Sequence, residues 1–208
     1  MCMKKNQLKK TLLISGLFSI VVMSCTRDKV VDPPEDINSP AYHITQSENL
    51  VIPDVIALPA NLPNGNSRVA TFFADGFQKY KAQEIPNSNP VAYQWVFVAP
   101  LADLYDATNK KVGNHSAGPT WQLSIADSIY GQAFNPPMTA ASSDANSIDW
   151  LLLMPKTGKP PTGFFANVSY VQRIDTKGGK APTTPPTNPS ETANVHYTAI
   201  YRFSKINP

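Results

Sequence analysis

The sequence predicts an all-β fold, a single-domain antiparallel β-sandwich or flattened barrel with long loops. Apolar and polar residues alternate with a period of two in several segments, whereas a helical period is almost absent. Twenty prolines are spread along the 208 residues, which argues against long helices. The clearest alternation lies near the end of the chain, where one face collects Val195, Tyr197, Ala199, Tyr201 and Phe203.

Residues 1–24 have the features of a lipoprotein signal peptide. Four lysines precede an apolar run over residues 11–23 that is too short to span a bilayer comfortably. The run ends in VMSC at residues 22–25, which resembles the lipobox where a signal peptidase cuts before a cysteine that receives lipid. We therefore expect Cys25 to be lipidated. Met23 is unusual at its position, so an ordinary cleaved signal followed by a chance cysteine stays the alternative.

The expected anchor gives the protein a place in the bacterial cell envelope. Thr26 follows the cysteine, where some lipoproteins retained in the inner membrane carry an aspartate. We therefore expect a lipid-anchored protein of the outer membrane, facing either the periplasm or the exterior. We expect the protein to associate with the membrane through the lipid on Cys25.

Cleavage before Cys25 changes the charge and the cysteine content of the chain. The removed peptide holds four lysines and no acidic residue, so the formal net charge falls from +3 to −1. No basic excess is left to attract nucleic acid, and we expect no nucleic-acid partner. Cys2 leaves with the signal peptide, so the folded part has no disulfide. We expect a monomer that its apolar core holds together.

Residues 25–49 are expected to form a tether between the lipid and a domain at residues 50–208. The tether sequence is charged, contains Pro33-Pro34 and has few apolar residues. The domain begins with LVIPDVIALP, whose prolines at positions 53 and 59 favour an extended first strand over a helix.

Turn residues then divide the domain into short apolar segments. RVATFFAD and FQKYKAQ flank Asp75-Gly76, which predicts a hairpin. YQWVFVAP is apolar on both faces, so we expect it to be buried on both sides. A turn is expected at residues 107–109, with Asp103 and Asp106 bonding backbone amides around it. Further strands are expected in PTWQLSI, SIYGQAF, DWLLLMP, FFANVSYVQRI and VHYTAIYRFS, with a long loop over residues 176–192.

The sequence lacks most signatures of known catalytic sites. No glycine-rich dinucleotide or phosphate loop is present, and we expect no cofactor. The segment at residues 113–118 is similar to a nucleophile elbow, but its serine lies one place too far along and Pro119 prevents the helix that should follow. The spacing of His115 and His196 matches no metal motif, and His43 lies in the expected tether. We therefore expect no metal site.

Aromatic residues are the remaining candidates for a binding surface. Tyr80, Trp95, Trp121 and Trp150 could form a stacking platform for a sugar or another planar ligand. The alternative is that they lie in the core, where aromatic residues of alternating strands usually go. Trp95 and Trp150 lie inside apolar runs and are expected in the core, whereas Trp121 fits either interpretation.

Six blocks of the sequence together resemble one family. They are GFQKY at residues 76–80, WVFVAP at 95–100, ADLYD at 102–106, KVGNHSAGPTW at 111–121, DWLLL at 149–153 and VQRIDTKGGKAP at 171–182. In this order they resemble the secreted bacterial and fungal family filed as domain of unknown function 3455. The resemblance runs from about Val51 to Phe203. It implies a single exported domain and brings no activity with it.

One departure from the family pattern implies a spatial neighbourhood. Family members often carry a cysteine two residues after the tyrosine of GxQxY and another shortly after GGxAP. Here the first position is Ala82, and the second region holds only threonines and prolines. The joint absence of both partners of a disulfide implies that residues 80–82 lie beside residues 181–187.

The segment NHSAGPTW, residues 114–121, allows two interpretations. In the structural one, Gly118-Pro119 forms a turn, Trp121 points inward and His115 bonds a backbone carbonyl. In the functional one, His115 and Trp121 lie at a shallow pocket with Gln78 and Tyr80. These four residues are the candidate ligand-binding site.

Two classes of function follow from these interpretations. The favoured one is a non-enzymatic binding or envelope-associated domain that takes a glycan or another small molecule. The alternative is a hydrolase or lyase that uses His115 with an unidentified carboxylate. A His115 ring hydrogen-bonded to Asp or Glu in a cleft would favour the enzyme, and a ring buried against backbone would favour binding.

Overall fold

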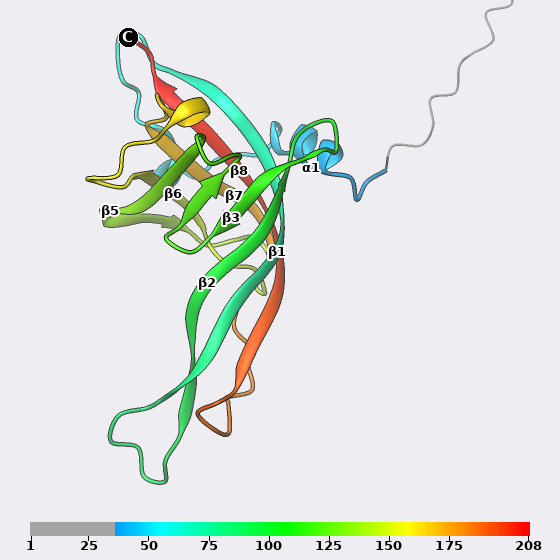
Figure 1. Ribbon diagram of the computed structural model, residues 1–208, viewed down its shortest axis with the longest axis vertical. Helices are drawn as coiled ribbons and strands as arrows, with labels where there is room; N and C mark the ends of the chain where they lie inside the picture. Colours follow the sequence, from blue (N-terminus) through cyan, green and yellow to red (C-terminus); the bar gives the residue numbers. More distant parts are fainter. Residues whose placement is uncertain (1–35) are drawn as a thin grey trace, which may run out of the picture. The chain divides into compact units, whose positions relative to one another are not determined.

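The computed structural model describes residues 36–208, which form one sheet of eight antiparallel strands closed into an uneven ring (Figure 1). The prediction of an all-β fold is confirmed, and the single closed sheet corresponds to the flattened barrel. Its strands are β1 (Asn66–Glu84), β2 (Tyr93–Tyr105), β3 (Lys111–Ser116), β4 (Thr120–Gln122), β5 (Ser128–Ala140), β6 (Trp150–Pro155), β7 (Tyr170–Gly178) and β8 (Thr192–Ile206). Its helical elements are α1 (Pro40–Ser47) and two 3₁₀ turns, η1 (Asp54–Ile56) and η2 (Gly163–Phe165).

Each strand pairs with its neighbours in the sequence, and the first strand closes the ring against the last. The pairing of β1 with β8 runs from Asn66 opposite Ile206 to Lys81 opposite Thr192. Closure leaves no free edge where the strands pair completely. The strands β1, β2 and β8 continue beyond the others as a long twisted ribbon (Figure 1). The ring and this ribbon share their strands, so residues of the ribbon border the interior of the ring.

The hairpin predicted at Asp75-Gly76 is wrong, because both residues lie inside the continuous strand β1. Gly76 pairs with Ala102 of β2, and a Cβ at position 76 would overlap the Leu101 carbonyl oxygen and Ala102. The glycine therefore serves a close approach of two strands rather than a turn. The sequence signal for a hairpin was local, whereas the β2 partners of Gly76 and Asp75 lie 26 and 28 residues away.

Two apolar clusters hold the fold. The first fills the inside of the ring and includes Trp121, Leu153, Val171, Tyr201 and Phe203. The second lies on the outer face and includes Ile44, Ile56, Phe73, Trp150 and Ile200. Trp150 is therefore a core residue, as expected, but it belongs to the outer cluster. The strands that separate the two clusters have both faces buried.

The N-terminal segment covers the outer face of the ring, which corrects part of the expected tether. Within residues 25–49, α1 packs on β1 and β8, and its His43 ring stacks on Phe73 with ring centroids 4.8 Å apart. Ser39 caps the helix by accepting a hydrogen bond from the backbone N–H of Tyr42, and Pro40 occupies the first turn. The expected signal peptide, Cys25 and residues 26–35 of the expected tether lie outside the described residues.

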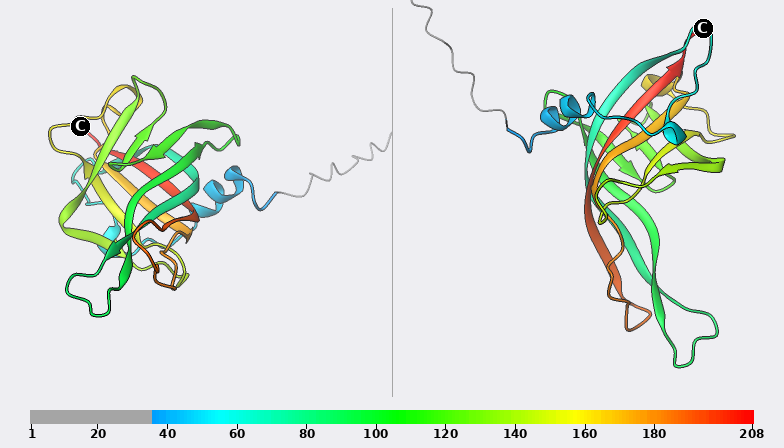
Figure 2. Two further views of the ribbon diagram at one scale, coloured as in Figure 1. Left: turned by 60° about the horizontal axis from the view of Figure 1, so that its bottom comes forward. Right: turned by 180° about the vertical axis from the view of Figure 1, so that it is seen from behind.

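The extended first strand predicted for LVIPDVIALP is also wrong. Residues 54–56 form η1, which contacts β5 and β6, so the segment crosses the outer face of the ring (Figure 2). Ile56 is fully buried, and its carbonyl accepts a hydrogen bond of 2.8 Å from the Gln172 side chain. The prolines prevent a regular helix, but they also leave this segment without the hydrogen-bond ladder of a strand.

Arg202 is a charged residue that is buried because α1 covers it. Arg202 alternates with Tyr201 and Phe203 and so lies on the opposite face of β8, yet only 6% of it is exposed. Its Nη2 donates a hydrogen bond of 2.6 Å to the Ser47 carbonyl and lies 3.3 Å from a Glu48 carboxylate oxygen. Both charges belong to the contact between α1 and the sheet. Of the helices in residues 36–208, none is long and apolar enough to cross a membrane.

The expectation that YQWVFVAP is buried on both sides is wrong. Phe97 and Val98 are half exposed, because this part of β2 belongs to the ribbon and no layer covers it. Trp95, expected in the core, is partly exposed and donates a hydrogen bond of 2.9 Å to the Thr184 carbonyl.

The turn predicted at residues 107–109 is present. The Asp106 carboxylate accepts hydrogen bonds from the backbone N–H groups of Thr108 and Lys110. Asp103 does not take part, because it lies in β2 and pairs with Lys111 across the strands at 2.8 Å.

The neighbourhood implied by the missing cysteines agrees with the hydrogen bonds of the ribbon. The Tyr80 hydroxyl donates a bond of 2.6 Å to the Gly179 carbonyl. Trp95, which pairs with Ala82 across β1 and β2, reaches the carbonyl of Thr184. Side-chain hydrogen bonds to the loop after β7 therefore tie it to this end of the ribbon.

Candidate functional site

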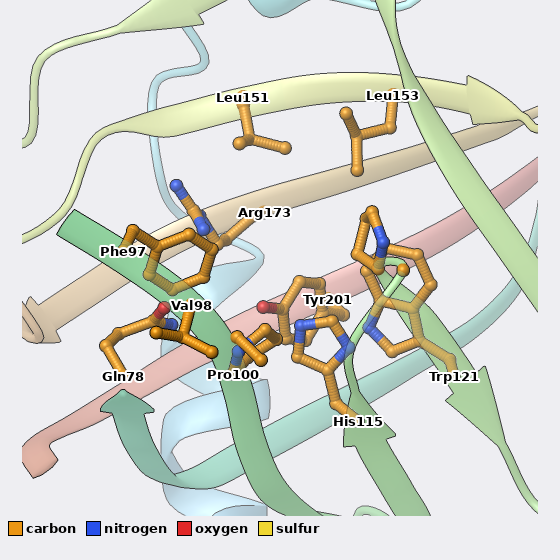
Figure 3. A pocket seen from close by; sticks show the side chains of 13 residues that line it. Gln78, Phe97, Val98, Pro100, His115, Trp121, Leu151, Leu153, Arg173 and Tyr201 are labelled. Carbon is orange, nitrogen blue, oxygen red and sulfur yellow. The ribbon is translucent and has the colours of Figure 1, made fainter. Parts of the chain in front are cut away.

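A pocket of about 360 Å³ opens into the ring between β2, β6, β7 and the turn that joins β3 to β4 (Figure 3). Its volume lies near the lower end of the about 300–1,000 Å³ typical of small-molecule sites. It is lined by Gln78, Phe97, Val98, Ala99, Pro100, His115, Gly118, Pro119, Trp121, Leu151, Leu153, Arg173 and Tyr201. The structure thus places three of the four candidate residues, Gln78, His115 and Trp121, around one cavity.

His115 is held by the strand pair that the segment NHSAGPTW forms. It lies in β3 opposite Trp121 of β4, and residues 117–119 make the turn between them. Its Nδ1 donates a hydrogen bond of 2.9 Å to the Thr120 carbonyl, and its ring stacks on the indole of Trp121. This geometry matches the structural interpretation, and both residues also line the pocket.

Burial decides the protonation state of His115. The ring is almost completely buried, and this loss of hydration lowers its pKa from 6.5 to about 3. The hydrogen bond to Thr120 works against this shift, and the nearby charge of Arg173 adds to it. His115 is therefore neutral near pH 7. Since Nδ1 carries the proton, Nε2 has a free lone pair and is a hydrogen-bond acceptor.

Trp121 forms the inner wall of the pocket. No part of it is exposed to solvent, and its ring packs edge-on against Tyr201 and Phe203. Gly131 provides space for it, because a Cβ there would lie 2.9 Å from the indole. The indole is thus a core residue whose surface also borders the cavity, which excludes it as an exposed stacking platform.

Gln78 and Tyr201 bring polar atoms without partners to the pocket. They are 3% and 1% exposed, and within residues 36–208 the Gln78 Nε2 and the Tyr201 hydroxyl make no hydrogen bond. Burial raises the pKa of Tyr201, while the neighbouring guanidinium of Arg173 works against that shift. Buried polar groups in folded proteins are nearly always hydrogen-bonded, so a water or a ligand is the expected partner of these two groups. The described residues hold further buried polar atoms without a partner, on Trp150, Tyr197 and Arg202, which do not line the pocket.

Arg173 is the candidate site residue that sequence reasoning missed. It lies in β7 opposite Tyr201 and Leu151, and its Nε and Nη2 donate to the Asp149 carbonyl at 3.1 and 2.7 Å. Among the described residues, no carboxylate pairs with it, and it is the only formally charged side chain that lines the pocket. An arginine on the same strand face as buried Val171 was the available signal.

An irregularity of β2 shapes the mouth of the pocket. The pairing with β1 shifts between Lys79, opposite Ala99, and Tyr80, opposite Phe97, so that Val98 is an extra residue. Such a bulge moves the inward direction from one set of alternate residues to the other. Phe97 and Val98 therefore both border the pocket, although neighbours in a regular strand point to opposite faces.

The other sequence candidates lie elsewhere. Tyr80 is beside the pocket without lining it, and its hydroxyl is bonded to Gly179. His196 is exposed on the outside of the sheet, where its Nε2 lies 2.6 Å from an Asp75 carboxylate oxygen, so it does not meet His115. The described part of the chain contains no group of three His, Cys, Asp or Glu side chains suited to a metal ion.

These features define the class as an antiparallel β-ring domain with a small, mostly apolar pocket in its interior. The chain belongs to the family described as protein of unknown function (DUF3455), whose model matches residues 63–205. The match covers the ring and every residue of the pocket, and it begins after α1 and η1. No curated protein and no solved structure matches the chain.

Proposed function

We propose that this protein is an envelope lipoprotein whose β domain binds a small molecule in the pocket beside His115. The observation that carries the proposal is the set of buried polar atoms without partners at this cavity, next to the unpaired charge of Arg173. A ligand with complementary groups would satisfy them, and the apolar walls would bury its remaining surface.

The state of His115 supports binding rather than catalysis. Its Nδ1 faces a backbone carbonyl where the hydrolase or lyase hypothesis needed a carboxylate. A pKa of about 3 makes the imidazole a weak base, far from the near-neutral value that suits a general base. Within the described lining there is no Asp, Glu, Ser or Cys to act with it.

A ligand screen by thermal shift tests the proposal without assuming a reaction. A compound that binds the native state raises the unfolding free energy by RT ln(1 + [L]/Kd), about 2.7 kcal/mol at a hundredfold excess over Kd. The Val98→Trp variant should abolish this effect, because it places an indole in the mouth of the pocket.

Leu101→Trp provides the matched control for the screen. Leu101 is also a half-exposed apolar residue of β2, but it does not line the pocket. This variant should respond to ligands as the wild type does. If Val98→Trp keeps every response of the wild type, the ligands bind elsewhere and the pocket proposal fails.

The envelope location rests on the N-terminal sequence and needs its own experiment. Cys25 follows a basic and apolar leader with a lipobox-like end. Metabolic labelling with a fatty-acid analogue should mark the wild-type protein in the outer-membrane fraction, and Cys25→Ala should lose both the label and the membrane association. Unchanged labelling in Cys25→Ala would mean that another residue carries the lipid.

A further inference from the structure

The polar atoms at the pocket that have no hydrogen-bond partner are mainly donors. Gln78 offers its amide N–H₂, Arg173 keeps Nη1 unbonded within the described residues, and the indole N–H of Trp121 is also without an acceptor. Tyr201 adds a hydroxyl. A ligand that satisfies these groups must bring acceptor oxygens, because arginine and indole groups only donate.

Except for the Trp121 indole, the donors and the charge lie toward one end of the cavity. Figure 3 shows the Gln78 amide, the Arg173 guanidinium and the Tyr201 hydroxyl on one side, with Trp121 and Leu153 on the other. The charge of Arg173 also acts on the titration of Tyr201 and of His115, as expected for groups close together. The pocket therefore has a cationic, donor-rich end and an apolar end.

We propose that the ligand is a small monocarboxylate with an apolar, preferably aromatic, body. The inference rests on the proposed function, that this pocket binds a small molecule. The carboxylate accepts hydrogen bonds from Arg173, whose planar guanidinium suits such a pair. The Tyr201 hydroxyl lies under the surface of the empty pocket, so it bonds the carboxylate only when the ligand displaces the cavity wall. The body packs between Leu153 and Trp121, and the neutral His115 offers its Nε2 to a hydroxyl or amine of the ligand.

Charge and volume narrow the class of ligand. The described lining holds one cation, Arg173, which balances one negative charge. A phosphate ester or another dianion would leave a second charge without a partner inside an apolar cavity, which is costly. A cavity of about 360 Å³ accepts a small acid and excludes a polymer chain from its interior. The exposed Phe97 borders the mouth, where it can contact the body of the acid.

Titration calorimetry with matched probes tests the charge requirement on the intact protein. The probes are phenylacetate, its neutral isostere phenylacetamide, and inorganic phosphate. Phenylacetate should bind with a Kd below about 1 mM. The amide should bind about tenfold to a hundredfold more weakly, because hydrogen bonds to a charged group are the strong ones. Phosphate should not bind, since it has no apolar body.

Two substitutions locate the carboxylate. Arg173→Gln should weaken phenylacetate about tenfold to a hundredfold and leave phenylacetamide unchanged, with partial recovery in Arg173→Lys. Substitution of Arg173 also removes its hydrogen bonds to the Asp149 carbonyl, so it can affect the fold as well as binding. Tyr201→Phe is therefore the second variant. It removes a hydroxyl without a partner, so the empty protein should keep or gain stability while phenylacetate binds several-fold more weakly.

The outcomes separate this inference from the proposed function. Equal affinities for phenylacetate and phenylacetamide overturn the carboxylate assignment, and so does phenylacetate binding that Arg173→Gln and Tyr201→Phe leave unchanged. No binding of phenylacetate below about 1 mM also overturns it. If an uncharged compound from the thermal screen still binds and Val98→Trp blocks it, the pocket keeps its proposed function while the carboxylate is excluded.

Discussion

The imidazole of His115 lies parallel to the indole of Trp121, with ring centroids 4.6 Å apart and an angle of 10° between the planes. The two residues face each other across β3 and β4, so the register of the strands sets the stack. One pair of side chains therefore fixes the corner of the ring and forms a wall of the pocket. The structural role and the proposed binding role fall on the same two residues.

Trp121→Ala should lower the free energy of unfolding by roughly 3–5 kcal/mol, because the fully buried indole leaves a cavity. Chemical denaturation of wild type and variant measures the loss. The matched control is Trp95→Ala, whose partly exposed indole lies outside the interior cluster and should cost less. A Trp121 loss within about half a kcal/mol, typical of surface positions, would show that the residue is not part of the core.

His115 should make the protein less stable in acid. The unfolded chain takes up a proton at His115 below pH 6.5, whereas the folded chain does so only near pH 3. The contribution of neutral His115 to the free energy of unfolding is therefore fully present above pH 6.5. It is lost as the pH falls toward 3, by about 1.4 kcal/mol per pH unit for this one proton. His115→Phe keeps an aromatic ring but cannot titrate.

The measurement is unfolding free energy against pH for both proteins, because their difference isolates His115 from other titrating groups. The wild-type free energy of unfolding should fall more steeply than that of His115→Phe between pH 6 and 4. This interval lies between the folded pKa of His115, about 3, and its ordinary pKa of 6.5. Parallel curves would mean that the imidazole is accessible to protons in the folded state.

Removal of residues 1–47 should destabilise the domain. The change deletes α1, which exposes Phe73 on the outer face and removes the Ser47 carbonyl that Arg202 bonds. We expect a loss of roughly 2–4 kcal/mol from the uncovered apolar surface. Thermal unfolding of chains starting at residue 36 and at residue 48 makes the comparison, with Ile44→Ala as the smaller, graded change. Equal melting temperatures would mean that α1 does not contribute to the stability of the ring.

Gly76→Ala should cost about 3 kcal/mol or more, because the added methyl overlaps backbone atoms of β2 that cannot move without opening the sheet. Lys81→Ala on the same strand is the control and should change stability by less than about half a kcal/mol. Circular dichroism and denaturation of the two variants decide the point. A well-tolerated Gly76→Ala would mean that β1 and β2 lie farther apart than the structure shows.

Local chemistry predicted those parts of the fold that depend on residues close in sequence. The turn at residues 107–109 follows from Asp106, whose carboxylate bonds the amides of Thr108 and Lys110. The inward face of β8 follows from its alternation, and Tyr197, Tyr201 and Phe203 are all buried. The Ser39-Pro40 start of α1 was also readable, as a cap followed by proline, but the charged surroundings concealed it.

Features that depend on distant pairing could not be predicted. Asp75-Gly76 has the local preference of a turn, and only its partners on β2 and β8 keep it extended. The site has the same limit, because Gln78, His115 and Arg173 come from β1, β3 and β7 and meet only after the ring closes. Sequence blocks identified two of these three residues. Arg173 was missed although it shares a strand face with Val171, because only the closed ring shows that this face borders a cavity.

The pairing of β1 with β8 also sets an order of events for the folding chain. Asn66 finds its partner only when Ile206 is available, so the loop that must close spans nearly the whole domain. Closing loops of this length slows folding, because the entropy is lost before the contacts form. A chain still emerging from the ribosome has open edges on β1 and β7 until residues 192–206 have been made. The final strand, β8, has fifteen residues and is therefore the element that closes the ring. A premature stop codon within it would leave β1 and β7 with unpaired edges, and the sheet would be prone to aggregate.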